Sequence, residues 1–128
     1  MINFISFVMV GSNDFKKSSK FYDAIFEPLK IKKIVTTERY VGYSHSEEPN
    51  KIKFYITKPQ NGELATYGNG TMIAFLAETR NAVNKFHEIA LENGAINEGL
   101  PGIREDGNYY AYVRDLDGNK ITAKCGSN

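Results

Sequence analysis

The hydrophobic and polar positions of the chain follow an order of elements that occurs twice. Ile2–Val10 is dense in Phe, Ile, Val and Met, which predicts a buried strand. Asp14 is a good N-cap for the helix predicted over Phe15–Phe26, where apolar residues recur at helical spacing until Pro28 ends it. Three short strands are predicted next, at about Lys32–Thr36, Tyr40–Ser44 and Lys51–Thr57.

The same order begins again after a glycine-containing connector over Gln60–Gly70. Thr71–Ala77 predicts a buried strand, and Thr79 is a suitable N-cap for a helix over Arg80–Asn93. Gly94 stands where a left-handed C-cap belongs. The chain is then predicted to continue with a loop that holds Gly99, Pro101, Gly102 and Gly107, a strand at Tyr109–Arg114, a tight Asp117-Gly118 turn and a last strand at Lys120–Cys125.

This repetition predicts an internal duplication. Its clearest trace in the sequence is Lys20-Phe21-Tyr22-Asp23, which corresponds to Lys85-Phe86-His87-Glu88 in the second half. The chain of 128 residues is therefore expected to be one α+β domain (1–128) made of two modules, at about 1–60 and 70–126.

Several predicted strands alternate, which indicates one covered sheet face and one face open to water or a ligand. The apolar series are Ile52, Phe54, Ile56; Ala111, Val113; and Ile121, Ala123, Cys125. The opposite series are Lys53, Tyr55, Thr57; Tyr110, Tyr112, Arg114; and Lys120, Thr122, Lys124. We expect the helices to cover the apolar face and the second face to form a concavity or a partner surface.

Composition narrows the class of protein. Sixteen Lys and Arg against 15 Asp and Glu give a net charge of +1, which is too balanced for a dedicated nucleic-acid-binding protein. The single cysteine, Cys125, cannot form an internal disulfide, and its place in the apolar series predicts a buried thiol. The N-terminus does not read as a signal peptide and no apolar run is long enough to span a membrane, so a cytoplasmic protein without membrane partners is expected.

Four segments resemble the vicinal oxygen chelate superfamily, which includes glyoxalase I, bleomycin-resistance proteins and extradiol dioxygenases. They are Phe7–Asp14 with Lys20–Asp23, Gly68–Phe75, Arg80–Leu91 and the closing hairpin Tyr109–Ile121. The resemblance implies two tandem βαβββ modules whose mixed, mostly antiparallel sheets form a cup around a central site. A ferredoxin-like α+β barrel is the alternative fold, but it lacks the match to the closing hairpin.

The resemblance also implies where a metal would lie. Metalloenzymes of this family hold a divalent ion with a His on the first strand, a His or Glu on the first strand of the second module, and a Glu on the last strand. Those places here hold Phe7, Met72 and Thr122. A phenyl ring donates nothing to a metal, and neither a thioether nor a neutral hydroxyl replaces a carboxylate. No metal and no cofactor is therefore expected at the cup.

The expected ligand site is the cup itself, and its catalytic residues, if there are any, are not identifiable from the sequence. The predicted ligand-binding residues are Phe7, Tyr55, Met72, Tyr110, Tyr112, Arg114 and Thr122. Tyrosine offers a flat apolar ring with one polar tip, and the planar fork of arginine suits a carboxylate. Alternatively, Phe7 and Met72 fill the former metal cavity as core, and Arg114 only pairs with Asp115 or Asp117.

Other candidate groups favour structural roles. His45 is expected in a solvated polar loop with Glu47 and Glu48, although a metal cluster is conceivable there, and His87 is expected to pack within its helix. Ser18 is expected on the helix surface, and Glu105 with Asp106 in a solvated turn.

Three classes of function remain open. The first is a metal-independent small-molecule binding protein similar to bleomycin-resistance proteins. The second is a lyase, isomerase or dioxygenase-type enzyme, such as one similar to lactoylglutathione lyase, with relocated or metal-independent catalysis. The third is an interaction protein whose cup is filled. In each case the resemblance and the exposed sheet edges predict a homodimer.

Overall fold

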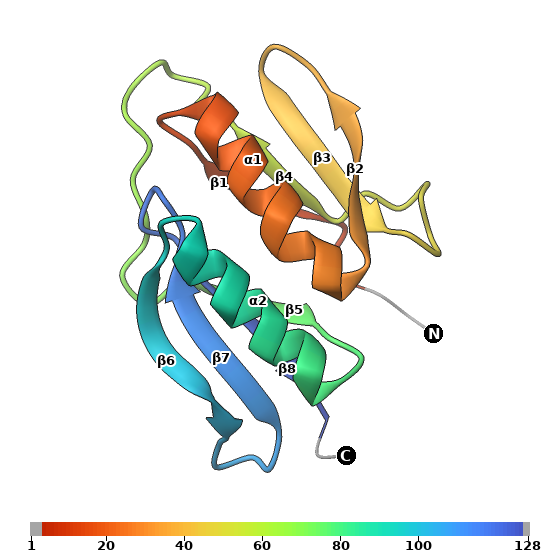
Figure 1. The fold of residues 1–128 in the computed structure, drawn as a ribbon. Helices are drawn as coiled ribbons and strands as arrows, with labels where there is room; N and C mark the ends of the chain where they lie inside the picture. Colours follow the sequence, from red (N-terminus) through yellow and green to blue (C-terminus); the bar gives the residue numbers. More distant parts are fainter. Residues whose placement is uncertain (1–3, 127–128) are drawn as a thin grey trace.

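Each half of the chain folds as one helix on one four-stranded sheet, as the computed structural model shows for residues 4–126 (Figure 1). The first module contains β1 (Val8–Gly11), α1 (Phe15–Phe26), the 3₁₀ turn η1 (Glu27–Leu29), β2 (Ile31–Thr36), β3 (Tyr40–His45) and β4 (Phe54–Thr57). The second contains β5 (Met72–Leu76), α2 (Arg80–Glu92), β6 (Ile96–Ile103), β7 (Tyr109–Arg114) and β8 (Lys120–Cys125).

The two modules have the same topology. The strand orders are β1-β4-β3-β2 and β5-β8-β7-β6, with the first strand of each module parallel to the last and the other neighbours antiparallel. The duplication and the α+β class with two βαβββ modules are thereby confirmed.

Local signals set the helix ends as predicted. The Asp14 carboxylate accepts the Lys17 N–H at 3.1 Å, and the Thr79 hydroxyl accepts the Ala82 N–H at 3.0 Å. After α2, Gly94 takes a φ of +99°, a conformation that costs glycine little. Pro28 lies in the 3₁₀ turn that follows α1.

Two strand predictions need correction. The first strand begins at Val8 rather than Ile2, because its partner β4 begins only at Phe54, which pairs with Val8. For the same reason, the strand predicted from Lys51 begins at Phe54. Residues 4–7 are irregular, and Ile2 and Asn3 lie outside the described residues.

The predicted loop with Gly99, Pro101 and Gly102 is wrong, since these residues lie in strand β6. The register between β6 and β7 shifts on both sides of Gly99. Such irregular positions are tolerated here because β6 is an edge strand. Gly107 lies in the turn before β7, with a φ of +83°.

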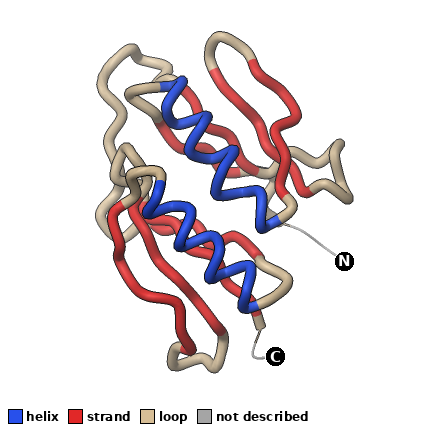
Figure 2. The backbone as a smooth tube through the Cα atoms, viewed as in Figure 1, coloured by secondary structure: helices blue, strands red, loops and turns tan. Residues whose placement is uncertain are grey.

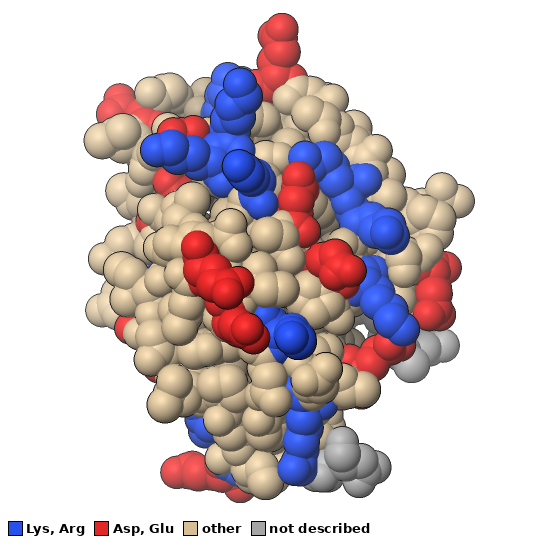
Figure 3. Space-filling view, viewed as in Figure 1, with Lys and Arg blue, Asp and Glu red and all other residues tan. Residues whose placement is uncertain are grey.

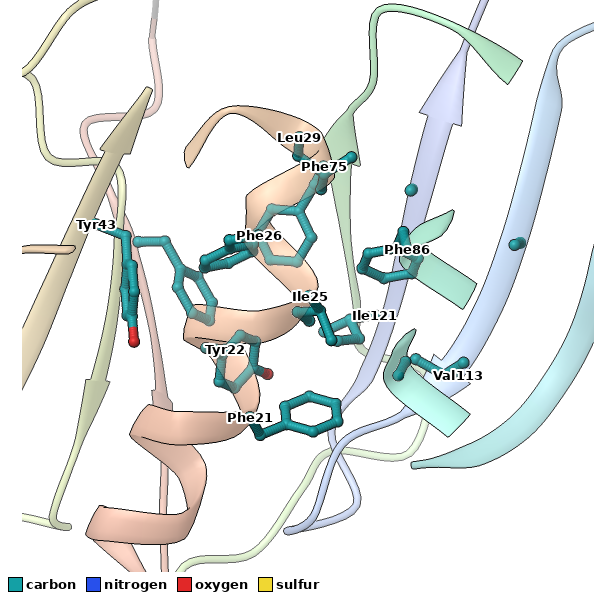
Figure 4. Packing of buried hydrophobic residues seen from close by; sticks show 14 of the residues in the cluster. Phe21, Tyr22, Ile25, Phe26, Leu29, Tyr43, Phe75, Phe86, Val113 and Ile121 are labelled. Atoms are coloured by element: carbon teal, nitrogen blue, oxygen red, sulfur yellow. The ribbon is translucent and has the colours of Figure 1, made fainter. Parts of the chain in front are cut away.

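One aromatic core joins the modules (Figure 4). The ring of Phe26, with 0% of its surface exposed, lies 5.0 Å from Tyr43 and 4.9 Å from Phe75, measured between centroids. Tyr43 belongs to the first sheet and Phe75 to the second, so α1 packs against both. Cys125 is buried as predicted.

A buried polar network also connects the modules. The Tyr22 hydroxyl donates to Asp115 at 2.5 Å, and the Ser18 hydroxyl donates to Asp117 at 3.0 Å. Ser18 is only 2% exposed, so its predicted place on the helix surface is wrong. Its neighbours along the helix gave no sign of this, because the acceptor comes from the β7–β8 turn, 99 residues away.

The helices lie side by side on one side of the molecule, and within residues 4–126 no helix covers the opposite face of either sheet (Figures 1 and 2). None of the helices described is long and apolar enough to cross a membrane. The uncovered sheet faces are therefore the surface that is open to a ligand or a partner.

Candidate functional site

Strand register places three predicted site residues of β7 on the uncovered face of the second sheet. Tyr112 pairs with Thr122 on β8, while the neighbours Ala111 and Val113 point to α2 and are 0% exposed. Because side chains alternate along a strand, Tyr110, Tyr112 and Arg114 share the other face. The pairing of Met72 and Lys120 across β5 and β8 adds Met72 to the same face.

The two tyrosines form a parallel pair surrounded by cations. The rings of Tyr110 and Tyr112 are 5.6 Å apart between centroids, with an angle of 6° between their planes. Arg104 and Lys120 lie 5.2 and 5.4 Å from the Tyr112 ring, and Lys124 lies 5.8 Å from the Tyr110 ring. Cations at this range are attracted by the faces of aromatic rings. This cationic tyrosine face, defined here by Arg104, Tyr110, Tyr112, Lys120 and Lys124, combines flat apolar surface with positive charge.

One carboxylate borders this cationic tyrosine face. The Tyr110 hydroxyl donates to Asp106 at 2.5 Å. That hydrogen bond lowers the pKa of Asp106 and raises the pKa of Tyr110, so the pair stays as a carboxylate and a neutral phenol around neutral pH. Asp106 therefore lies in a turn as predicted, but it orients a site tyrosine.

Arg114 is engaged by partners that the sequence did not indicate. Its Nε donates to Glu98 at 3.1 Å and its Nη1 donates to the carbonyl of Gly118 at 3.0 Å. The guanidinium also lies 5.3 Å from the ring of Tyr67 in the connector. The predicted alternative pairing of Arg114 with Asp115 or Asp117 is thus replaced by Glu98, which lies on the strand that was taken for a loop.

The predicted site residues of the first module form a separate aromatic group. Phe7 and Tyr55 make an edge-to-face contact at 5.1 Å, and Tyr55 makes another with Tyr40 at 5.5 Å. Phe7 and Tyr55 also line an open hollow of about 520 Å³, together with Phe4 and Lys53. Each ring contact of Phe7, Tyr55, Tyr110 and Tyr112 described above stays within its own module.

Phe7 and Met72 do not fill a core cavity in the single chain. They are 50% and 43% exposed. Thr122, by contrast, is 0% exposed, and its hydroxyl donates to the carbonyl of Ala111 at 2.5 Å. The Thr122 hydroxyl therefore bonds within the sheet. It does not offer a free polar group to a ligand on the open face.

The two histidines also occupy defined places. The Nε2 of His87 lies 2.9 Å from the side-chain oxygen of Asn97, and His87 is 5% exposed, so it packs against its neighbours as predicted. His45 ends β3, with Glu47 close by as expected from the sequence. Glu78 of the second module joins them, and no local pattern indicated that.

Three basic residues of the cationic tyrosine face were not predicted. The alternation of β8 did place Lys120 and Lys124 on the face of Thr122. Including the charged residues of that face among the predicted site residues would therefore have found both lysines. Arg104 had no such signal, because it follows the irregular strand β6.

The comparisons with known proteins agree with the two-module fold. Residues 4–122 match the family described as the Glyoxalase/Bleomycin resistance protein/Dioxygenase superfamily. A glyoxalase/bleomycin resistance protein from Albidiferax ferrireducens T118 is 41% identical and superposes with a TM-score of 0.87, over 96% of this chain and 98% of that one. No curated protein matches the sequence.

Two more distant solved structures share the fold. A family enzyme from Burkholderia phytofirmans PsJN is 20% identical with a TM-score of 0.73, over 94% of this chain and 97% of that one. The fosfomycin resistance protein FosX from Listeria monocytogenes is 16% identical with a TM-score of 0.69, over 98% and 95%. With the match over residues 4–122 and the two-module topology, the chain belongs to the glyoxalase/bleomycin resistance protein/dioxygenase superfamily.

Proposed function

We propose that the protein binds a small, flat molecule with an anionic group on the uncovered sheet faces. The observation that carries this proposal is the parallel pair of Tyr110 and Tyr112 with three cations within 5.8 Å of the rings. A flat ligand can stack on the exposed ring surface, and Lys120 or Lys124 can meet its anionic group. Both tyrosines are partly exposed, so the surface is accessible in the single chain.

Arg114 is not assigned the direct contact with the anion that the sequence analysis expected. Its guanidinium already donates to Glu98 and Gly118, so its main contribution is to hold the neighbouring elements in place. The direct contact with an anion is assigned to the two lysines of β8.

The binding we propose does not depend on a metal. The family's divalent ion requires imidazole and carboxylate donors, and the corresponding positions offer a ring, a thioether and a hydroxyl. The hydroxyl of Thr122 is directed to a backbone carbonyl, and Phe7 packs edge-on against Tyr55. These residues do not fit the ion, so no reaction step is assigned to one.

We further propose that the ligand site is completed in a homodimer. Large apolar side chains stay exposed along β1, β5 and the segment before β1: Phe4, Ile5, Phe7, Met9, Met72 and Leu76. A monomer rarely exposes so many large apolar side chains along two edge strands unless the surface meets a partner. A second copy, related by a two-fold axis, would cover it with the same residues.

The homodimer is tested by light scattering on the purified protein at micromolar concentration. We expect a mass of twice 14.4 kDa for the wild type, and dissociation at low micromolar concentration for Met9→Glu, because a charge would be buried in the interface. Leu64→Glu is the matched control, since Leu64 is 80% exposed in the connector and should leave the dimer intact. A wild-type mass near 14.4 kDa would contradict the proposal.

The ligand proposal is tested by calorimetry with a series of aromatic acids. We expect Tyr112→Leu to weaken binding about tenfold and Lys120→Ala about threefold to tenfold, since these variants remove a stacking surface and a charge. The control is Lys85→Ala, on the exposed surface of α2. Equal binding by all four proteins would exclude the cationic tyrosine face, and no binding of any flat acid by the wild type would exclude the proposed function.

A further inference from the structure

A second group of chemically active side chains lies away from the cationic tyrosine face, where η1 and β3 meet the start of α2. His45, Glu47 and Glu78 each present one ligand atom, and these atoms all lie within 4.8 Å of one another. His45 and Glu47 come from the end of β3 and the turn after it, whereas Glu78 comes from the link between β5 and α2. From this convergence we propose that the three residues form a site for a divalent transition-metal ion of the Zn²⁺ or Ni²⁺ type, which bridges the two modules.

The donor set decides the class of ion. Imidazole favours Zn²⁺, Ni²⁺ and related ions over Mg²⁺ and Ca²⁺, and carboxylates complete the coordination of such ions in many proteins. Glu47 and Glu78 are exposed and His45 is partly exposed, so water molecules can take the remaining positions. The site is thus suited to reversible binding of a metal ion rather than to a closed structural centre.

The charges around the group already attract a cation. The ammonium of Lys30 lies 2.6 Å from Glu78, in an ion pair in which both side chains are more than half exposed. Lys30 reaches this position from a left-handed backbone conformation, with a φ of +60° at the end of η1. The hydrogen bond from Lys30 lowers the pKa of Glu78, so the carboxylate is ionised, but the same ammonium has to leave before a metal ion can bind there.

Metal binding exchanges two exposed interactions for coordination bonds. Lys30 must move away from Glu78, which costs little because exposed ion pairs contribute little. The Nδ1 of His45 accepts the Glu47 N–H at 3.1 Å, and a neutral imidazole has a single lone pair. Coordination by either ring nitrogen therefore replaces this hydrogen bond.

The Lys30–Glu78 ion pair already links the two modules at the surface, and the metal would replace it with coordination bonds from both modules. An ion that binds only the folded chain stabilises it by an amount that rises with the logarithm of the ion concentration, once that concentration exceeds the dissociation constant. The site would in this way hold β3 against the start of α2.

The test uses untagged protein treated with a chelator and then dialysed. Isothermal calorimetry with Zn²⁺ and with Ni²⁺ should show one site per chain, and His45→Ala and Glu78→Gln should each weaken binding about tenfold or more. Glu48→Gln is the matched control, because Glu48 is in the same loop but pairs with Lys51 at 3.1 Å. It should bind as the wild type does.

A third variant separates a metal site from general attraction to acidic residues. Lys30→Met removes the competing ammonium and should tighten binding about threefold, in line with the small contribution of an exposed pair. Thermal unfolding without metal checks that each variant is folded. The proposal is overturned if the wild type shows no saturable binding, if His45→Ala and Glu78→Gln bind as the wild type does, or if Glu48→Gln weakens binding equally.

Discussion

We expect Phe26→Ala to reduce the free energy of unfolding by about 3–5 kcal/mol, which is the usual cost of truncating a buried phenylalanine. The ring of Phe26 is 0% exposed and lies within 5.5 Å, between centroids, of Tyr43, Phe54 and Phe75. The three neighbours come from three strands and both modules, so the space left by the ring cannot be closed by moving one element. Denaturant unfolding followed by circular dichroism measures the loss.

Truncation of an exposed apolar side chain is the control for Phe26→Ala. Leu64→Ala removes an apolar side chain that is 80% exposed in the connector, and we expect it to change stability by less than about 0.5 kcal/mol. If Phe26→Ala cost no more than Leu64→Ala, the shared aromatic core would not be what holds the modules together.

The second large effect is expected at Asp115, which is 4% exposed. One of its carboxylate oxygens accepts the backbone N–H groups of Asp117 and Asn119, both at 2.9 Å, and the other accepts the Tyr22 hydroxyl. Asp115→Ala removes the acceptor of these three donors and of the Asn119 side-chain amide, which donates to Asp115 at 2.9 Å. Because each unsatisfied buried group costs about 1–3 kcal/mol, we expect a loss of about 3 kcal/mol in denaturant unfolding at pH 7.

Two conservative variants show how much of the stability lost in Asp115→Ala comes from individual hydrogen bonds and how much from the charge. Tyr22→Phe keeps the packed ring and removes one hydroxyl, so a loss of about 1 kcal/mol is expected. Asp115→Asn keeps one oxygen for the backbone N–H groups of Asp117 and Asn119 and should be milder than Asp115→Ala. A loss in Asp115→Asn as large as in Asp115→Ala would show that the charge, rather than the hydrogen bonds, stabilises the turn.

The same residue predicts a dependence of stability on pH. Burial raises the pKa of Asp115, although hydrogen bonds from Tyr22 and Asn119 oppose the rise. Folding therefore favours the protonated carboxyl. The contribution of the protonated Asp115 carboxyl to stability is complete below the pKa of this group in the unfolded chain, about 3.9. It is lost as the pH rises through the higher pKa of the same group in the folded chain.

Asp115→Asn isolates this contribution, because asparagine does not titrate in this range. The stability of the wild type minus that of Asp115→Asn should decrease as the pH rises from about 4. It should then become constant at higher pH. A difference that grows over this interval would mean that the folded state lowers the pKa instead.

What the sequence determined by itself is mostly local. The caps Asp14 and Thr79 and the C-terminal Gly94 set the helix ends, because each acts on backbone groups within a few residues. Alternation in β7 and β8 placed Tyr110, Tyr112 and Arg114 on one face for the same reason, since side-chain direction follows from strand periodicity alone. With the repeated order of elements, these signals were enough to predict the two modules.

Tertiary structure decided the rest, because the partners concerned are distant in the chain. Pairing with β7 makes a strand of the segment around Gly99, whose own residues favour a loop. Packing of the β7–β8 turn against α1 buries Ser18 beside Asp117. The joining of the modules brings Glu78 to His45. A contact of this kind depends on how two elements pack in space, and no pattern within either element records it.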